Sequence, residues 1–193
     1  MKKLLLTGFE PFLAFSINPT AEIVRKLNQR KMNNFQVVGD ILTVDFQKSG
    51  KQLVDIIEDH NPDAIISLGL AAGRNRITPE RIAINCNDGP QDNGGYKPVG
   101  EKIFADGPDG LFTRLPIRQM VKHLQNAGLP AEISNTAGAY LCNHVMYHGL
   151  YYFDGPAGFI HLPASHALAV EKKLPSWSQQ DLLQAVKVCI ESL

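Results

Sequence analysis

Short runs of apolar residues alternate along this sequence with longer amphipathic segments. The runs over 3–8, 64–68 and 158–162 are too short for helices and almost wholly apolar, which is typical of strands that are buried on both faces. Residues 49–60 carry their apolar side chains on one side, which is typical of a helix that covers a sheet. The alternation predicts an α/β fold, an α/β/α sandwich with a mostly parallel, twisted sheet.

Local signals define the other expected elements. Asn18-Pro19 is a helix-start signal, and Gly128 stands where a helix would end. The expected strands are 3–8, 35–43, 64–68, 81–85, 131–134 and 158–162, and the expected helices are 20–32, 49–60, 114–126, 139–151 and 179–192. Residues 87–109 are rich in Gly, Pro, Asp and Asn with little periodicity, so we expect a lid or a binding loop there.

Bulk composition excludes several classes of protein. The 193 residues suffice for one domain, expected to span residues 1–193. Nineteen basic residues balance nineteen acidic ones, and no nucleic-acid-binding motif is present, so we expect no nucleic acid partner. No stretch reaches the roughly 18 apolar residues of a membrane span, and we expect no membrane partner. Three widely spaced cysteines favour free thiols in a reducing compartment, and we expect a cytoplasmic protein.

Cys142 has the context of a reactive thiol. The segment from Ser134 to Asn143 runs from the end of an expected strand, through small and helix-capping residues, into an amphipathic helix. Cys142 then lies near the first turn, where the helix dipole and free N–H groups would lower its pKa and could bind an oxyanion. The alternative is a buried cysteine that packs as a small apolar residue, which is what we expect of Cys86 and Cys189.

Two further residues could complete a catalytic site. His161 follows an apolar strand and would lie at the carboxyl edge of the sheet, where open α/β proteins place their sites. Glu80 opens an otherwise apolar segment, which suggests a buried role. A cysteine nucleophile needs a base, and the base needs an acidic partner. The alternatives are a hydrogen-bonded core histidine and a surface ion pair between Glu80 and Arg81.

Four segments together resemble the pyroglutamyl peptidase I (pyrrolidone-carboxylate peptidase) family of cysteine peptidases. They are GLAAGRNRITPERIAIN (69–85), LPAEISNTAGAYLCN (129–143), GFIHLP (158–163) and LTGFEPF (6–12). The resemblance implies an exopeptidase (omega-peptidase) that removes N-terminal pyroglutamate from peptides. It implies Cys142 as nucleophile, His161 as general base and acid, and Glu80 as orienting carboxylate. It also implies a phosphorylase/hydrolase-like fold, no metal or cofactor, and a homo-oligomer, commonly a tetramer.

The resemblance also suggests a substrate pocket. Phe9 and Phe12 match an aromatic pair that packs on the lactam ring in this family, although both could be core residues. Thr43, Leu70, Tyr140 and Leu141 fall at further pocket positions of the family.

Three segments depart from the family pattern, all at the expected rim of the pocket. Leu70 replaces a glutamine, and Leu13-Ala14 replaces a glycine pair. Residues 88–91 are one residue short and lack an expected Arg and Ile. These changes leave the substrate range open.

Two other functions compete with this one. His144 and His148 are four residues apart on an expected helix, a spacing that can hold zinc in a metal-dependent hydrolase. They lack an intervening Glu and a clear further ligand. The second competitor is a non-catalytic or altered-specificity homologue that binds a small amide ligand.

Overall fold

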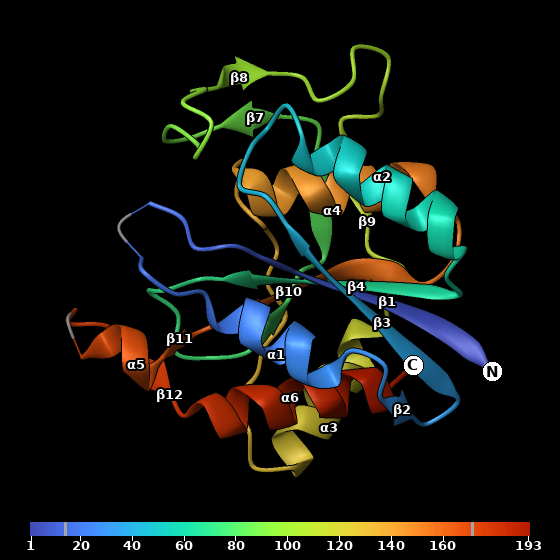
Figure 1. Ribbon diagram of the computed structural model, residues 1–193, viewed down its shortest axis with the longest axis vertical. Coiled ribbons are helices and arrows are strands. Elements are labelled where there is room, and N and C mark those ends of the chain that lie inside the picture. Colours follow the sequence, from blue (N-terminus) through green and yellow to red (C-terminus); the bar gives the residue numbers. More distant parts are fainter. Residues whose placement is uncertain (14, 171) are drawn as a thin grey trace.

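The computed structural model describes residues 1–13, 15–170 and 172–193, and is built around one six-stranded sheet (Figure 1). The strand order is β2-β3-β1-β4-β10-β5. These strands are β1 (Lys2–Phe9), β2 (Lys31–Met32), β3 (Phe35–Leu42), β4 (Ala64–Leu70), β5 (Thr78–Pro79) and β10 (Ala157–Leu162). The four central strands pair in parallel, and only the short outer strands β2 and β5 run antiparallel to their neighbours. The predicted α/β fold with a mostly parallel sheet is confirmed.

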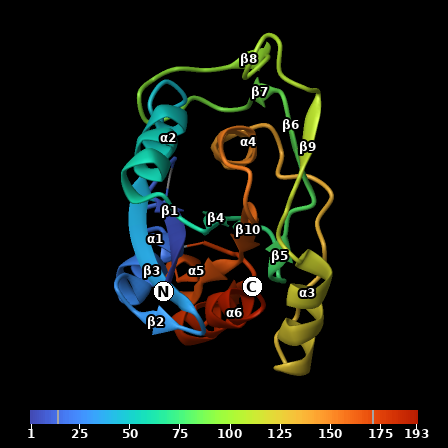
Figure 2. The same ribbon diagram turned by 90° about the vertical axis from the view of Figure 1, so that its right-hand side faces the viewer.

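Helices cover both faces of the sheet, as Figure 2 shows edge-on. The helices α2 (Ser49–His60) and α4 (Leu141–Tyr152) lie on one face, and α1 (Pro19–Leu27), α3 (Ile117–Asn126) and α6 (Gln179–Glu191) lie on the other. Each face has its own apolar core, and β4 between them is buried along its whole length. Burial on both faces explains why β4 is a continuous apolar run.

Short elements gather beyond the carboxyl ends of the central strands or beside α4. They are the pairs β6 (Ile82–Ile84) with β9 (Gly110–Phe112), β7 (Asn87–Asp88) with β8 (Val99–Glu101), and β11 (Ala164–Ser165) with β12 (Ser176–Trp177), together with the helix α5 (His166–Ala169). The expected loop 87–109 therefore contains a small hairpin. No helix in the described ranges has the length and apolar character needed to cross a membrane.

The two predicted helix signals act as expected, and a third helix has its predicted bounds. Asn18 caps α1, because its Oδ1 accepts the N–H of Thr20 at 3.1 Å, and Pro19 opens the helix. Helix α2 spans the predicted residues and ends at Asn61 in the left-handed conformation, with φ of 44°. Gly128, with φ of 75°, follows the end of α3.

Two expected elements differ in the structure. The helix expected over 20–32 ends at Leu27, because the side chain of Asn28 accepts the N–H of Gly39 and Gln29 turns to a φ of 62°. The chain then returns as β2 against β3. The strand expected over 131–134 is wrong as well, since Ala131 and Ser134 make only isolated bridges to Ile77 and Glu80.

Candidate active site

Cys142 is the second residue of α4. Its side chain is half-buried, and the N-cap residue Tyr140 forms no side-chain hydrogen bond to the helix start. The first backbone N–H at this helix start that donates to an earlier carbonyl of the helix is that of His144, which bonds to Tyr140 O at 3.0 Å. Cys142 therefore lies in the first turn of the helix, as the sequence predicted, among residues whose N–H groups have no acceptor along the helix.

His161 and Glu80 form a buried pair. His161 is the penultimate residue of β10, and its Nδ1 lies 2.7 Å from Glu80 Oε1. Glu80 follows β5, which pairs antiparallel with β10, and the Glu80 N–H donates to Phe159 O at 2.9 Å. The Glu80 side chain is fully buried, and it makes no ion pair with Arg81, whose Nε donates to Asn135 instead. The surface-pair alternative is therefore wrong.

Gly69 lies next to both the thiol of Cys142 and the strand that carries His161. In the parallel register of β4 and β10, Gly69 lies opposite His161. A methyl group added at Gly69 would sit 2.9 Å from Cys142 Sγ. Register partners on parallel strands point to the same face, about 4.8 Å apart. The sulfur therefore lies on the His161 face of the sheet, one strand away, in the space that a side chain at position 69 would fill.

Replacing Gly69 by alanine is expected to lower kcat by about 10- to 100-fold, because the added methyl group displaces the sulfur by a fraction of an ångström. The methyl group would also lie 2.6 Å from the ring of Phe159, which is fully buried, so some loss of stability should accompany it. The matched control is Gly73→Ala in the same segment, where a methyl group meets nothing within 4 Å. Equal kcat values for the two variants would show that the space at Gly69 is not needed.

The electrostatics of the thiol correct one expectation. Burial, together with the negative charge of Glu80, raises the pKa of Cys142 to about 12, against the lowering expected from its helix position. The backbone N–H of Cys142 and the charge of Arg74 lower this pKa, but desolvation outweighs them. Burial also lowers the pKa of His161, although Glu80 raises it. Both shifts favour a neutral Cys142 thiol and a neutral His161 imidazole at neutral pH.

Arg74 also belongs to this cluster and was not predicted. Its Nη1 lies 2.6 Å from Glu80 Oε1, the same oxygen that binds His161. The available signal was its position six residues before Glu80, within the segment that resembles the family.

Five of the six predicted pocket residues wall one apolar slot at the sulfur. Its lining is Phe9, Phe12, Val44, Leu70, Tyr140, Leu141 and Cys142. Thr43 is not among them, because its N–H and hydroxyl are directed at the side chain of Gln52, and its neighbour Val44 lines the slot instead. The free volume is about 10 Å³, about the room needed for one water molecule. The slot is therefore narrow in this structure.

Two of the three segments that depart from the family pattern lie at this slot. Gly89, with φ of 138°, lies against the Tyr140 ring, which would be 3.0 Å from an added methyl group. Leu70 is buried and points into the slot. Leu13 is exposed with φ of 52°, and Ala14 lies outside the described residues.

His144 and His148 lie in a packed interior region. Their rings are 4.2 Å apart, His144 Nδ1 lies 2.9 Å from Asn87 Oδ1, and His148 Nδ1 lies 2.9 Å from His144 O. Within residues 1–13, 15–170 and 172–193, no group of three or more His, Cys, Asp or Glu side chains is arranged to hold a metal ion. The zinc hypothesis therefore has no third ligand in that part of the chain.

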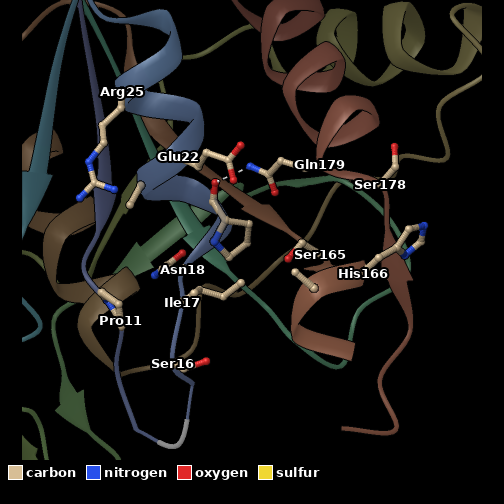
Figure 3. A pocket seen from close by; sticks show the side chains of 13 residues that line it. Pro11, Ser16, Ile17, Asn18, Glu22, Arg25, Ser165, His166, Ser178 and Gln179 are labelled. Carbon is tan, nitrogen blue, oxygen red and sulfur yellow. Dashed lines mark hydrogen bonds between the residues drawn. The ribbon is translucent and has the colours of Figure 1, made fainter. Parts of the chain in front are cut away.

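A separate cavity of about 450 Å³ lies near the starts of α1 and α6 (Figure 3). Its lining includes Asn18, Ser165, His166 and Gln179, and none of the predicted site residues.

The fold and the site define an α/β protein with a thiol, an imidazole and a buried carboxylate at one sheet edge. The family model described as "Pyroglutamyl peptidase" matches residues 2–193. The chain is 61% identical over 198 residues to the pyrrolidone-carboxylate peptidase of Oceanobacillus iheyensis, with 100% of both chains covered. It is 57% identical to that of Lysinibacillus sphaericus, covering 99% of this chain and 96% of the relative.

Solved structures agree. A mutant pyrrolidone carboxyl peptidase from Pyrococcus furiosus superposes with a TM-score of 0.96 at 41% identity, covering 98% of this chain and 97% of that one. The enzyme from Thermococcus litoralis gives 0.96 at 37% identity, covering 100% and 93%. The chain belongs to the pyroglutamyl peptidase family.

Proposed function

We propose that this protein is a cysteine omega-peptidase that hydrolyses the amide bond after an N-terminal pyroglutamyl residue of a peptide. The observation that carries the proposal is the junction of an apolar slot with Cys142, whose sulfur lies one strand from the buried His161–Glu80 pair. The family membership of the chain supports the same substrate class.

The first half of the reaction is thiol acylation. His161 takes the Cys142 proton through Nε2 as the sulfur attacks the carbonyl carbon, because Nδ1 is bound to Glu80. Glu80 stabilises the imidazolium that forms, which allows a thiol with a raised pKa to react. The free N–H groups of the first turn of α4 bind the oxyanion. The imidazolium then protonates the leaving amine, the C–N bond breaks, and the shortened peptide leaves. The pyroglutamyl group remains on Cys142 as a thioester.

The second half is hydrolysis of the thioester. His161, again neutral, accepts a proton from water, whose oxygen attacks the thioester carbonyl. The tetrahedral intermediate collapses, the C–S bond breaks, and the proton returns to the sulfur. Free pyroglutamate leaves the slot, and no group outside the chain is consumed except water.

The location and the assembly are further parts of the proposal. Cys86, Cys142 and Cys189 are free thiols, which supports a reducing compartment, the cytoplasm. Several apolar side chains are exposed on the monomer, Val99 at 84% and Phe112 at 64% among them, which supports a homo-oligomer. The tetramer rests on the family resemblance, and sedimentation analysis of the purified protein measures it.

The test is turnover of a pyroglutamyl amide that releases a chromophore. The wild-type protein should cleave it, iodoacetamide should abolish the rate by alkylating Cys142, and added pyroglutamate should slow the alkylation. Extensive EDTA treatment should leave the rate unchanged. No release of chromophore would favour the non-catalytic alternative. Loss of the rate with EDTA and its return with zinc would favour the His144/His148 alternative.

A further inference from the structure

One oxygen of Glu80 carries two hydrogen bonds. Oε1 accepts from His161 Nδ1 at 2.7 Å and from Arg74 Nη1 at 2.6 Å. The other oxygen, Oε2, is buried and has no hydrogen-bond partner among the described residues. The carboxylate is itself fully buried, whereas the Arg74 side chain remains about one-third exposed. Arg74 and His161 therefore share the charge of a single carboxylate oxygen.

Arg74 also touches the two segments on either side of that carboxylate. Its Nη1 donates to the hydroxyl of Thr78, which in turn lies 3.5 Å from the backbone carbonyl of His161. Its Nη2 donates to Thr136 O at 3.2 Å, in the loop that leads to Cys142. One guanidinium thus connects the acid, the histidine strand and the approach to the nucleophile, the kind of fork geometry that lysine cannot reproduce.

We propose that Arg74 is a positioning residue for the reaction proposed above, one that sets the protonation of the Cys142–His161 pair through Glu80. Arg74 does not line the slot and so does not contact the substrate ring. Arg74 shares Glu80 Oε1 with His161 as a hydrogen-bond acceptor, and it adds a positive charge next to the Cys142–His161 pair. Only the kinetic test of this role rests on the proposed function.

The sign of the effect follows from the charges that face His161. Glu80 lies against its Nδ1, Arg74 lies behind Glu80, Cys142 approaches from α4, and Gly69 on the neighbouring strand contributes no charge. The positive charge of Arg74 disfavours the imidazolium and favours the thiolate, so it lowers the pKa of both His161 and Cys142. Removing this charge should raise both pKa values.

The pH profile follows from that sign. Only neutral His161 accepts the thiol proton, so kcat/KM of the wild type should fall on the acid side of the pKa of His161, which lies below 6.5. With Arg74→Gln, which keeps an amide donor but loses the charge, the midpoint should rise by about one pH unit. The decrease in kcat at pH 6 should be several-fold and should approach about tenfold at pH values below both midpoints, with KM within about twofold.

The test compares the pH midpoint and kcat of the wild type with those of three variants: Arg74→Gln, Arg74→Lys and, as matched control, Arg76→Gln. Arg76 lies two residues away in an exposed pair with Glu132 at 3.6 Å, so its loss should change neither the midpoint nor kcat. Arg74→Lys keeps the charge but not the fork, so its midpoint should stay within about 0.3 of the wild-type value while kcat falls. If Arg74→Gln does not fold, a shift of a full unit in Arg74→Lys overturns the proposal.

A second readout needs no substrate. The rate at which iodoacetamide alkylates Cys142 at a fixed pH of about 8, followed by mass spectrometry, should be lower in Arg74→Gln than in the wild type, because a higher thiol pKa leaves less thiolate. An unchanged alkylation rate in a folded Arg74→Gln protein would overturn the proposal even if kcat fell. If the wild type cleaves no pyroglutamyl amide, the proposed function fails, while the alkylation rate still tests the role of Arg74.

Discussion

Cys142→Ala should lower turnover of a pyroglutamyl amide by at least about 10³-fold, and Cys142→Ser should be nearly as poor. The reason is specific to this site. In the proposed mechanism the slot and the helix start hold the reacting carbonyl against one sulfur, and His161 deprotonates that sulfur. A serine hydroxyl holds its proton far more tightly than a thiol, so the same imidazole removes it poorly. The measurement is kcat with circular dichroism of each variant as a check on folding.

The other two cysteines supply the controls. Cys86 is half-buried beside β7, and Cys189 is fully buried in the core on α6, where burial raises its pKa to about 12. Cys86→Ser and Cys189→Ala should keep kcat within about twofold, the second with some loss of stability because it leaves a small cavity. Full activity in Cys142→Ala would exclude a cysteine mechanism.

A pyroglutamyl amide should react about 10⁴-fold faster than the matched prolyl amide, measured as kcat/KM. The two rings differ by one carbonyl, but the prolyl nitrogen is a charged amine and the lactam nitrogen is neutral. The slot at Cys142 is walled by apolar and aromatic side chains, with no charged side chain in its lining. A cation that enters this slot loses its water without gaining a counter-ion, whereas a lactam needs only hydrogen bonds.

The size of the slot sharpens this prediction. Because the slot is narrow, with a free volume of about 10 Å³, fitting a five-membered ring into it carries a steric cost. That cost falls equally on both substrates, so the ratio of kcat/KM isolates the chemistry of the ring nitrogen and carbonyl. The experiment compares anilides of the two amino acids at one pH, with the same leaving group. A ratio below about tenfold would show that the slot is not built for a lactam, and would leave the role of Cys142 untouched.

Local sequence determined the framework of this protein. The apolar runs of β1, β4 and β10 are recognisable because strands buried on both faces are almost wholly apolar. Helix α2 matches its predicted bounds because its apolar side and its end at Asn61 are both local signals. The helix start at Cys142 was readable for the same reason. These features depend on neighbours a few residues away, which a sequence displays directly.

Tertiary contacts decided the rest. Helix α1 stops at Leu27, although residues 29–31 have good helix propensity, because Asn28 and Gln29 bind to β3. Val44 lines the slot in place of Thr43, since Gln52 on α2 engages the threonine. Neither partner is local to the segment that it changes.

The site shows the same division. The sequence predicted the catalytic residue types and the elements that carry them. The pKa of Cys142, however, is above the ordinary thiol value, whereas its helix position predicted a lower one. A helix start is a local property, whereas burial depends on every segment that closes over the sulfur. The pairing of Arg74 with the oxygen that holds His161 is also set by distant segments, since β5 and β10 bring residues 80 and 161 together. Charge–charge and desolvation energies depend on distances through space, and those exist only once the sheet has formed.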